Sequence, residues 1–278
     1  MNHSRIQCFS HLLFLLILSM VALVPSQEVE DEREFDYVKG SEVGPEHWGE
    51  LRSEWAMCKK GKMQSPIDLL NQRVEVVPKS EEIHKFYNPS EAVLKNRGHD
   101  IEIKWKGENS KILINGTEYF LRQAHWHSPS EHSINGKRFA MELHMVHLTY
   151  DKKIAVIGLL YDIGQSNPFL EKLMKKIESI SDSSEEVDIG VINPAEIEMR
   201  GDNYYRYMGS LTTPPCSEGV LWTVNKQIAT VSEEQVALLR EAVHDSAEEN
   251  ARPSQPVNGR KVRLFGRKTR RGGSDGTL

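Results

Sequence analysis

The residues best suited to chemistry in this sequence are three histidines in two short segments, His125 with His127 and, further on, His144. On a β-strand, residues two apart share a face, so His125 and His127 would point to one side. Glu142 and His144 would do the same on the next strand. The segment from His127 to Phe139 contains Ser, Pro, Asn and Gly and is long enough to let the two strands lie antiparallel. The spacing therefore predicts that three imidazoles meet at one site.

Three imidazoles with an open fourth position are the ligand set of a catalytic zinc site, whereas structural zinc sites are usually closed by four ligands rich in cysteine. The sequence has no cysteine cluster. Gln123 and Glu142 each stand two residues before a histidine, where a side-chain oxygen can hold the imidazole N–H. Without a metal, His125 and His127 would be ordinary core or surface histidines, and their polar neighbours would belong to a solvated strand face. The additional His144 beside a polar partner favours the metal.

A second interpretation of the same metal site is that of a cupin, because His125-x-His127-x3-Glu131 resembles the first motif of the cupins, which use three histidines and a glutamate. In that alternative Glu131 binds the metal, and the protein is an oxidase or isomerase. The match is partial, since Tyr119 stands where a glycine is expected and Gly136 has the wrong spacing. The second cupin motif is missing from the sequence.

Strand patterns dominate the chain around these residues. Residues 99–106 and 139–148 alternate between apolar and polar, and residues 154–161 form an apolar run typical of a strand buried on both faces. Helical patterns are fewer. An amphipathic stretch follows Asn167-Pro168, and a capping box before a second apolar series begins at Ser232. We therefore expect a mainly β fold with peripheral helices.

The composition fits one large globular domain. The chain has 278 residues, of which 38% are hydrophobic and 27% charged, with a mean hydropathy of -0.50. Its net charge of -5 provides no basic field, so we expect no nucleic-acid partner. The sequence specifies no oligomeric state.

The first residues have the pattern of a targeting segment. The apolar run 12–24 follows Arg5 and leads into Val24-Pro25-Ser26, whose small residues suit a cleavage site. We interpret residues 1–26 as a signal peptide for the secretory route. The alternative is a membrane anchor, which needs about 20 apolar residues. The run is shorter than that, so we expect no membrane span.

The two ends of the remaining chain differ in charge. Residues 28–36 hold six acidic residues and one Arg, which predicts a solvated, mobile acidic arm over residues 27–44. The chain ends in a basic segment, and we expect residues 266–278 to be a disordered tail, with binding to an anionic surface as the alternative. The folded domain is expected over residues 45–265.

Two cysteines, Cys58 and Cys216, remain after removal of the signal peptide. An even pair in an oxidising compartment predicts one disulfide, with two buried thiols as the alternative. Closing so long a loop would stabilise the fold by about 4 to 5 kcal/mol in the chain-entropy model. One N-glycosylation motif, Asn115-Gly116-Thr117, lies between apolar runs and has the pattern of a hairpin turn that exposes Asn115.

The motifs along the chain resemble those of the α-class carbonic anhydrases from about His47 to Phe265. With the signal peptide and the cysteine pair, they are similar to the extracellular and plant-like branch, in which cysteines at these two positions are bridged. The resemblance implies one domain on a large, mostly antiparallel, twisted sheet of about ten strands. The motifs, in the family's order, are His47-Trp48-Gly49, Gln64-Ser65-Pro66-Ile67-Asp68, Asn96-Arg97-Gly98-His99, the His-x-His segment with Glu131-His132, Glu142-Leu143-His144, Gly209-Ser210-Leu211-Thr212-Thr213-Pro214-Pro215 and Asn250-Ala251-Arg252-Pro253.

The resemblance implies an enzyme that reversibly hydrates carbon dioxide to bicarbonate and a proton by attack of zinc-bound hydroxide. Zinc would be held by His125, His127 and His144. Thr212 would accept a hydrogen bond from the hydroxide and donate one to Glu131, so that Glu131 is not a metal ligand. The resemblance also assigns substrate contacts to Thr213, for bicarbonate, and to an apolar wall of Val146, Val156, Leu211, Val220 and Trp222.

His99 matches the family's proton shuttle, although a histidine after glycine is more often an ordinary surface residue. The sequence departs from the family at three positions related to this role. Glu50, directly after the His47-Trp48-Gly49 motif, stands where a tyrosine is common. Arg97 and Glu102, near His99 in the sequence, replace neutral residues that order the water chain. Charged neighbours would shift the pKa of His99. The alternative to an enzyme is a binding or storage protein on the same fold. Export along the secretory route leaves the apoplast and the chloroplast as destinations.

Overall fold

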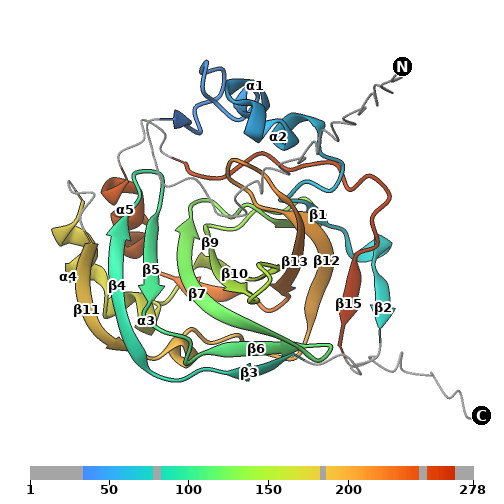
Figure 1. Cartoon of the computed structure of the whole chain (residues 1–278). Helices are drawn as coiled ribbons and strands as arrows, with labels where there is room; N and C mark the ends of the chain where they lie inside the picture. Colours follow the sequence, from blue (N-terminus) through green and yellow to red (C-terminus); the bar gives the residue numbers. More distant parts are fainter. Residues whose placement is uncertain (1–33, 78–82, 182–185, 244–248, 267–278) are drawn as a thin grey trace, which may run out of the picture.

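A single large β-sheet dominates the computed structural model, which describes residues 34–77, 83–181, 186–243 and 249–266 (Figure 1). Within these ranges the sheet has 13 strands. Its main path runs β11-β4-β5-β7-β9-β10-β13-β12-β15-β2, while β14 pairs with β10, and β6 joins β3 to β7. The strands are β2 (Glu75–Val77), β3 (His84–Phe86), β4 (Ser90–Asn96), β5 (Ile101–Trp105), β6 (Lys111–Ile114), β7 (Thr117–His127), β9 (Met141–Leu148), β10 (Ile154–Ile163), β11 (Glu186–Ile192), β12 (Tyr204–Ser210), β13 (Glu218–Asn225), β14 (Ala229–Val231) and β15 (Arg263–Phe265). A separate parallel pair consists of β1 (Asp68–Leu69) and β8 (Ser133–Ile134).

The expected mainly β fold is confirmed, but two details of the expectation are wrong. The sheet is mixed rather than mostly antiparallel, because β10 lies parallel to β13 and β14, and β15 lies parallel to β2. The strands in the described ranges also exceed the expected ten. Residue patterns identify a strand but not its direction, and parallel neighbours are joined through long crossovers that leave no local pattern. Strands of three residues, such as β2 and β14, are too short to show an alternation.

The helices are short and lie around the sheet, as expected. The capping box at Ser232 is present, since the Ser232 side chain accepts from the Gln235 backbone N–H and the Gln235 side chain accepts from that of Ser232. The stretch after Asn167-Pro168 forms two short helices rather than one. In the described part of the chain, no helix is long and apolar enough to cross a membrane. The helices are α1 (Trp48–Leu51), α2 (Met57–Lys60), α3 (Pro168–Glu171), α4 (Met174–Ser179) and α5 (Glu233–Ala242), with 3-10 turns η2 (Ser53–Trp55), η3 (Asn71–Arg73) and η4 (Pro194–Glu196).

Two hydrophobic cores lie on opposite faces of the central strands. On β9, Leu143 and Met145 belong to the larger core, whereas Val146 belongs to the smaller one. This division follows the alternation of side chains along a strand. The predicted strand over residues 154–161 is β10, which contributes to both cores and is buried on both faces.

A β-bulge decides which residues of β7 face which core. The register between β7 and β9 shifts between Leu121 and Gln123. Leu121 pairs with His147, while His125 pairs with His144, although Leu121 and His125 are four residues apart and would share a face on a regular strand. The bulge therefore turns Leu121 into the larger core and leaves His125 on the opposite face.

The described end of the acidic segment is packed, which corrects part of the expectation of a solvated arm. Phe35 and Tyr37 are buried and pack edge-on against Trp48. Their aromatic surface outweighs the charges that alternate with them in the sequence. The disulfide between Cys58 and Cys216 is confirmed, and both cysteines contact this aromatic cluster.

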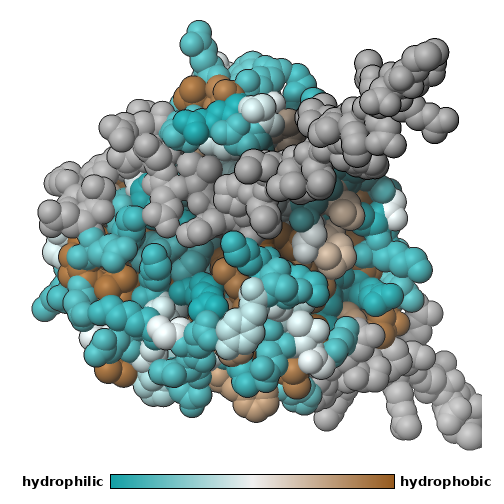
Figure 2. Space-filling model, in the orientation of Figure 1, coloured by the Kyte–Doolittle hydropathy of each residue, from teal (hydrophilic) through white to brown (hydrophobic). Residues whose placement is uncertain are grey.

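The predicted hairpin is also present. Strands β6 and β7 pair antiparallel on either side of Asn115-Gly116, and Asn115 is exposed with a positive φ of 50°. The surface seen in Figure 2 is mainly hydrophilic, with small separate hydrophobic areas. The expected signal peptide, residues 1–26, and the basic tail from residue 267 lie outside the described residues.

Candidate metal centre

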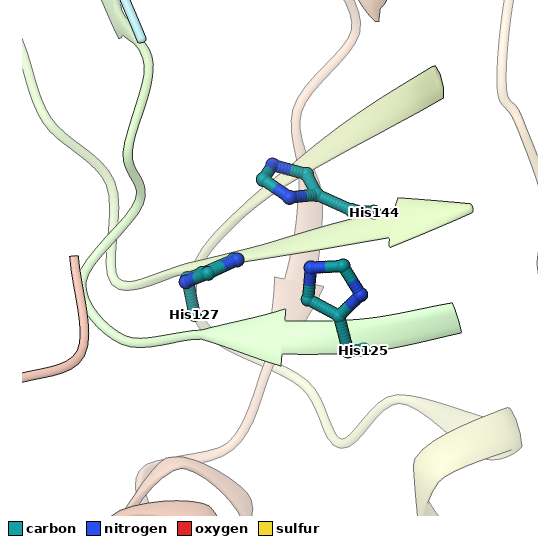
Figure 3. Close-up of side chains that lie close together, drawn as sticks. All are labelled: His125, His127 and His144. Atoms are coloured by element: carbon teal, nitrogen blue, oxygen red, sulfur yellow. The ribbon is translucent and has the colours of Figure 1, made fainter. Parts of the chain in front are cut away.

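Three imidazoles converge where β7 and β9 lie side by side (Figure 3). His125 and His127 stand on β7, and His125 pairs with His144 of β9 in the antiparallel register. One ring nitrogen from each histidine lies within 4.8 Å of the others. All three side chains are buried. The three histidines thus meet at one site, as their strand spacing predicts.

In each of the three rings, the nitrogen that does not point toward the other two histidines hydrogen-bonds to an oxygen. His125 Nδ1 lies 2.8 Å from Gln123 Oε1, and His144 Nε2 lies 2.9 Å from Glu142 Oε1, so both polar neighbours occupy the expected places. The third partner is not a side chain, because His127 Nδ1 donates to the backbone carbonyl of Asn250 at 2.7 Å. Since the partners accept these hydrogen bonds, the opposite nitrogen of each ring keeps a free lone pair.

The free ring nitrogens suit a metal ion. The Nε2 atoms of His125 and His127 are buried and have no hydrogen-bond partner among the described residues. Buried polar atoms without a partner destabilise a fold unless a ligand satisfies them. Burial also lowers the pKa of His125 well below its usual value, which keeps this ring neutral, as a metal ligand must be. Three imidazole nitrogens without cysteine fit zinc in the open geometry of a catalytic site.

Glu142 is held firmly behind His144. Its Oε1 also contacts His132 Nδ1 at 2.7 Å, and its Oε2 accepts from the His132 backbone N–H at 2.8 Å. Burial alone would raise the pKa of Glu142, but the contacts with His132 and His144 bring it well below its usual value. Gly158 faces this point from β10, where a Cβ would lie 2.9 Å from Glu142 Oε1. The glycine therefore leaves room for a charged acceptor that orients His144.

The hydrogen-bonded chain continues from His132 to the segment that carries the predicted threonines. His132 Nε2 lies 2.7 Å from the Tyr207 hydroxyl, which lies 2.8 Å from Ser65 Oγ. Ser65 Oγ accepts from the backbone N–H of Ser210 at 3.1 Å, and Ser210 precedes Leu211-Thr212. The sequence suggested no role for these residues. His132, Ser65 and Ser210 belong to the family motifs, whereas Tyr207 lies outside all of them.

Glu131 lies beside the centre and is buried, like the two threonines that the resemblance assigns to the substrate site. Glu131 Oε1 accepts from the Arg252 backbone N–H at 2.9 Å, and its Oε2 lies 3.7 Å from His127 Nε2. Glu131 Oε2 and the Thr213 hydroxyl are buried and lack a hydrogen-bond partner among the described residues. Thr212 is buried too, but in the structure, as far as it describes the chain, the expected hydrogen bond from Thr212 to Glu131 is not formed. These polar atoms are therefore available to a ligand.

The side chain of Arg252 joins the surroundings of Glu131 to the N-terminal segment. Its guanidinium donates to Gln64 Oε1 and to the carbonyls of Ser65 and Cys58 at 2.8 to 3.0 Å. It also lies over the ring of Trp48, with 5.6 Å between guanidinium carbon and ring centroid. From the sequence, Arg252 could be recognised only as part of a family motif, because the residues that its side chain contacts are distant along the chain. Arg252 thus holds Glu131 against the disulfide-bonded segment.

The five residues expected to form an apolar wall belong to the smaller core. Val156 of β10 pairs with Val146 of β9 and with Trp222 of β13. The Trp222 ring lies 4.8 Å from that of His144, so this core adjoins the centre. All five are buried: Val146, Val156, Leu211, Val220 and Trp222.

His99 lies between β4 and β5 and is buried. Asn250 Nδ2 donates to the His99 carbonyl at 2.7 Å, so the residue that holds His127 also holds the His99 backbone. The His99 ring packs on Phe35, with 5.0 Å between ring centroids. Burial lowers the pKa of His99 to about 4.

The three departures noted near His99 have different surroundings. Glu50 is exposed and forms an ion pair with Lys59 on the surface. Arg97, in contrast, is buried and binds the Asp100 carboxylate through two hydrogen bonds. Its Nη1 also lies 3.3 Å from Glu102 Oε2. Two of the departures therefore belong to a buried charged cluster, and the third does not.

Fold and site together define a class of protein, a mainly β protein whose central strands carry three convergent histidines that could hold a metal ion. Comparisons with known proteins identify the family within that class. A family model described as eukaryotic-type carbonic anhydrase matches residues 43–265. The chain therefore belongs to the eukaryotic-type carbonic anhydrases, and the family that its motifs predict is confirmed.

Individual relatives cover almost the whole chain. Alpha carbonic anhydrase 7 of Arabidopsis thaliana is 51% identical over 269 residues, which are 95% of this chain and 98% of that protein. A crystal structure of dioscorin complexed with ascorbate has a TM-score of 0.81 and 44% identity, covering 84% of this chain and 98% of its own. The α-carbonic anhydrase from Thermovibrio ammonificans, in complex with the inhibitor sulfanilamide, has a TM-score of 0.75 and 37% identity, covering 82% and 98%.

Proposed function

We propose that this protein catalyses the reversible hydration of carbon dioxide to bicarbonate and a proton. The observation that carries the proposal is the convergence of three buried imidazoles, those of His125, His127 and His144, with one ring nitrogen of each within 4.8 Å of the others. A zinc ion held by them would supply a Lewis acid that lowers the pKa of water to about 7, a value for which carbonic anhydrase is itself the standard example. A nucleophile would then be available near neutral pH.

The neighbouring residues would orient the reactants. Glu131 Oε2, which has no hydrogen-bond partner among the described residues, would accept a hydrogen bond from Thr212, and Thr212 in turn would accept one from the nucleophile. Carbon dioxide is apolar and would lie against the wall that contains Val146 and Trp222. Thr213, whose hydroxyl is buried without a partner in the described residues, would donate to the bicarbonate formed.

The proton released in the reaction needs a carrier between the centre and the solvent. We propose His99 for this role, because Asn250 ties its backbone to the same residue that holds His127. Histidine is suited to the role, since it takes up and releases protons near neutral pH. Burial lowers the pKa of His99 even though the Asp100 carboxylate beside it acts in the opposite direction, and the low pKa opposes proton uptake.

Stopped-flow hydration of carbon dioxide by the purified chain, with its zinc content measured and a sulfonamide as inhibitor control, tests the proposed function. We expect one zinc per chain and rapid hydration that the sulfonamide abolishes. Bound zinc without hydration would instead favour a binding or storage protein. Dioscorin, solved with ascorbate, has the same fold, so the fold alone does not separate these two functions.

We also propose export along the secretory route and a glycan on Asn115. The apolar run within residues 1–26 supports export, and the exposed position of Asn115 in the turn after β6 supports the glycan. The chloroplast and the extracellular space are both reachable by this route. Expression in a plant cell, followed by fractionation and glycosidase treatment, tests both proposals. A mobility shift that persists in Asn115→Gln would disprove the glycan site.

A further inference from the structure

The residue after His99 places a carboxylate beside its ring. Asp100 Oδ2 lies 3.6 Å from His99 Nε2, just beyond hydrogen-bond length, and both side chains are fully buried. Neither nitrogen of the His99 ring has a hydrogen-bond partner among the described residues. A small rotation of the ring would bring Nε2 within hydrogen-bond distance of the carboxylate.

Asp100 itself is held in place by Arg97. Arg97 Nε donates to Asp100 Oδ1 at 2.7 Å, and Arg97 Nη2 donates to Asp100 Oδ2 at 2.5 Å. The Arg97 backbone N–H also donates to the Asp100 carbonyl at 2.9 Å, and Gly98 N–H donates to Asn96 Oδ1 at 2.8 Å. Two-point contacts of this kind fix the direction of a carboxylate. The loop therefore presents Asp100 to His99 in a defined position.

Among the charged side chains that act on the His99 ring, Asp100 is the one that favours its protonated form. Phe35, from the N-terminal segment, is uncharged, and Asn250 contacts only the backbone carbonyl. Arg97 and, from β7, His127 both disfavour a positive charge on the ring, whereas Asp100 favours it. Glu102 of β5 acts at one remove, since it lies against Arg97. Without the Asp100 carboxylate, a proton on the buried His99 ring would meet burial and repulsion together.

We propose that Asp100 is a positioning residue for proton transfer, with its carboxylate serving as the counter-ion of protonated His99. The inference rests on the proposed function. His99 takes the proton delivered by water from the centre, its Nε2–H donates to Asp100 Oδ2, and the proton then leaves to buffer. An O–H bond of the donor water breaks as the N–H bond forms on the His99 ring, and that N–H bond breaks when the proton passes to the buffer, which gains it. Arg97 keeps the carboxylate in position and stops it from taking the proton, because their contact favours the ionised acid.

Comparing kcat with kcat/KM separates this role from the chemical step. Proton export limits kcat, whereas the hydration step itself sets kcat/KM. Stopped-flow hydration in weak buffer would be measured for the wild type, Asp100→Asn, His99→Ala and the double variant, with Asp188→Asn on the exposed edge strand β11 as the matched control. We expect about a threefold to tenfold loss of kcat in Asp100→Asn, with kcat/KM and zinc content unchanged. Added imidazole buffer should restore kcat, and Asp188→Asn should match the wild type.

The double variant distinguishes action through His99 from general loosening. If Asp100 acts through His99, Asp100→Asn has no further effect in the His99→Ala background. A further loss there, or an unchanged kcat in Asp100→Asn alone, would overturn the inference. Should Asp100→Asn fail to fold, Arg97→Lys keeps the charge but loses the two-point contact, and the same selective loss of kcat is expected.

An NMR titration of the His99 ring keeps the inference testable even if the protein does not hydrate carbon dioxide. Absence of hydration by the zinc-loaded wild type would refute the proposed function, whereas the titration reports on the pair directly. We expect removal of the Asp100 carboxylate to lower the pKa of His99 relative to the wild type. An equal or higher pKa in the variant would refute the counter-ion role.

Discussion

Two buried histidines of strand β9, His144 and His147, lie three residues apart and face opposite sides of the sheet. His144 uses Nε2 to bind Glu142 and keeps its other nitrogen for the centre. His147 uses both nitrogens, because Nδ1 donates to the Met145 carbonyl at 3.0 Å and Nε2 accepts from the Tyr87 hydroxyl at 2.9 Å. Burial is the same for both rings.

The comparison shows that burial does not distinguish a functional histidine from a structural one. What distinguishes them is the number of ring nitrogens that the protein leaves unused. His147 is a satisfied part of the fold, whereas His144 belongs to a group of rings with nitrogens directed at one point. Substitutions on the two faces of β9 should therefore separate function from stability.

The largest effect is expected for His144→Ala, which removes one of three metal ligands. Loss of a ligand should abolish stoichiometric zinc binding and reduce hydration by at least about a thousandfold, since the nucleophile depends on the metal. Zinc analysis and stopped-flow hydration measure both. Ala in place of His125 or His127 should give the same result. Full activity in any of these variants would disprove the ligand assignment.

A smaller effect on the same face is expected for Glu142→Gln. The amide lacks the charge that binds both His144 and His132, so the ligand ring loses its orientation. Outer partners of this kind typically change metal affinity or activity by about 10- to 100-fold. Competition with a zinc chelator measures the affinity, with Glu91→Gln on the exposed side of β4 as the control. Equal zinc affinity in Glu142→Gln and the control would show that Glu142 is not needed to orient the ligand.

On the other face, His147→Gln should leave zinc affinity and hydration unchanged and alter the pH dependence of stability. Burial lowers the pKa of His147 to about 3, from a usual value of 6.5. Between these values the unfolded chain binds a proton that the folded chain refuses, so stability falls as the pH decreases from about 6.5 to about 3.

The expected contribution of His147 is about 1.4 kcal/mol per pH unit in the middle of that range. Urea unfolding of the wild type and the variant between pH 4 and pH 7 measures it, since other titrating groups contribute to both. The variant should show the shallower slope. Parallel slopes would mean that His147 is protonated in the folded protein, and lost hydration would mean that the two faces are coupled.

The convergence of the three histidines and the places of Gln123 and Glu142 could be predicted because strand periodicity places residues two apart on one face. The meeting of His125 with His144 also depends on the bulge next to Leu121, which no alternation in the sequence reveals. The main strands and the hairpin at Asn115 were predictable for the same local reasons. Parallel pairing in the sheet was not, because it depends on the path of long connections.

Contacts between distant segments explain what the sequence missed. The acceptor for His127 is a backbone carbonyl of Asn250, which has no side-chain signature. Tyr207 joins the network around Glu142 only after folding brings β12 beside the centre. The pairing of Arg97 with Asp100 is local along the chain. The motif comparison drew attention to the charges of Arg97 and Glu102 near His99, but not to the carboxylate of Asp100, which matches no family motif.

The distance along the chain between His127 and Asn250 has a consequence for synthesis on the ribosome. The two residues are 123 positions apart, so at about 5 to 20 residues per second roughly 6 to 25 seconds separate their emergence. Once His144 has followed, the nascent chain contains all three histidines but still lacks the acceptor that orients one of them. We expect ribosome-bound chains that end before the Asn250 segment to retain zinc poorly and chains that extend past it to retain zinc well. Metal loading would then report that translation has passed Asn250.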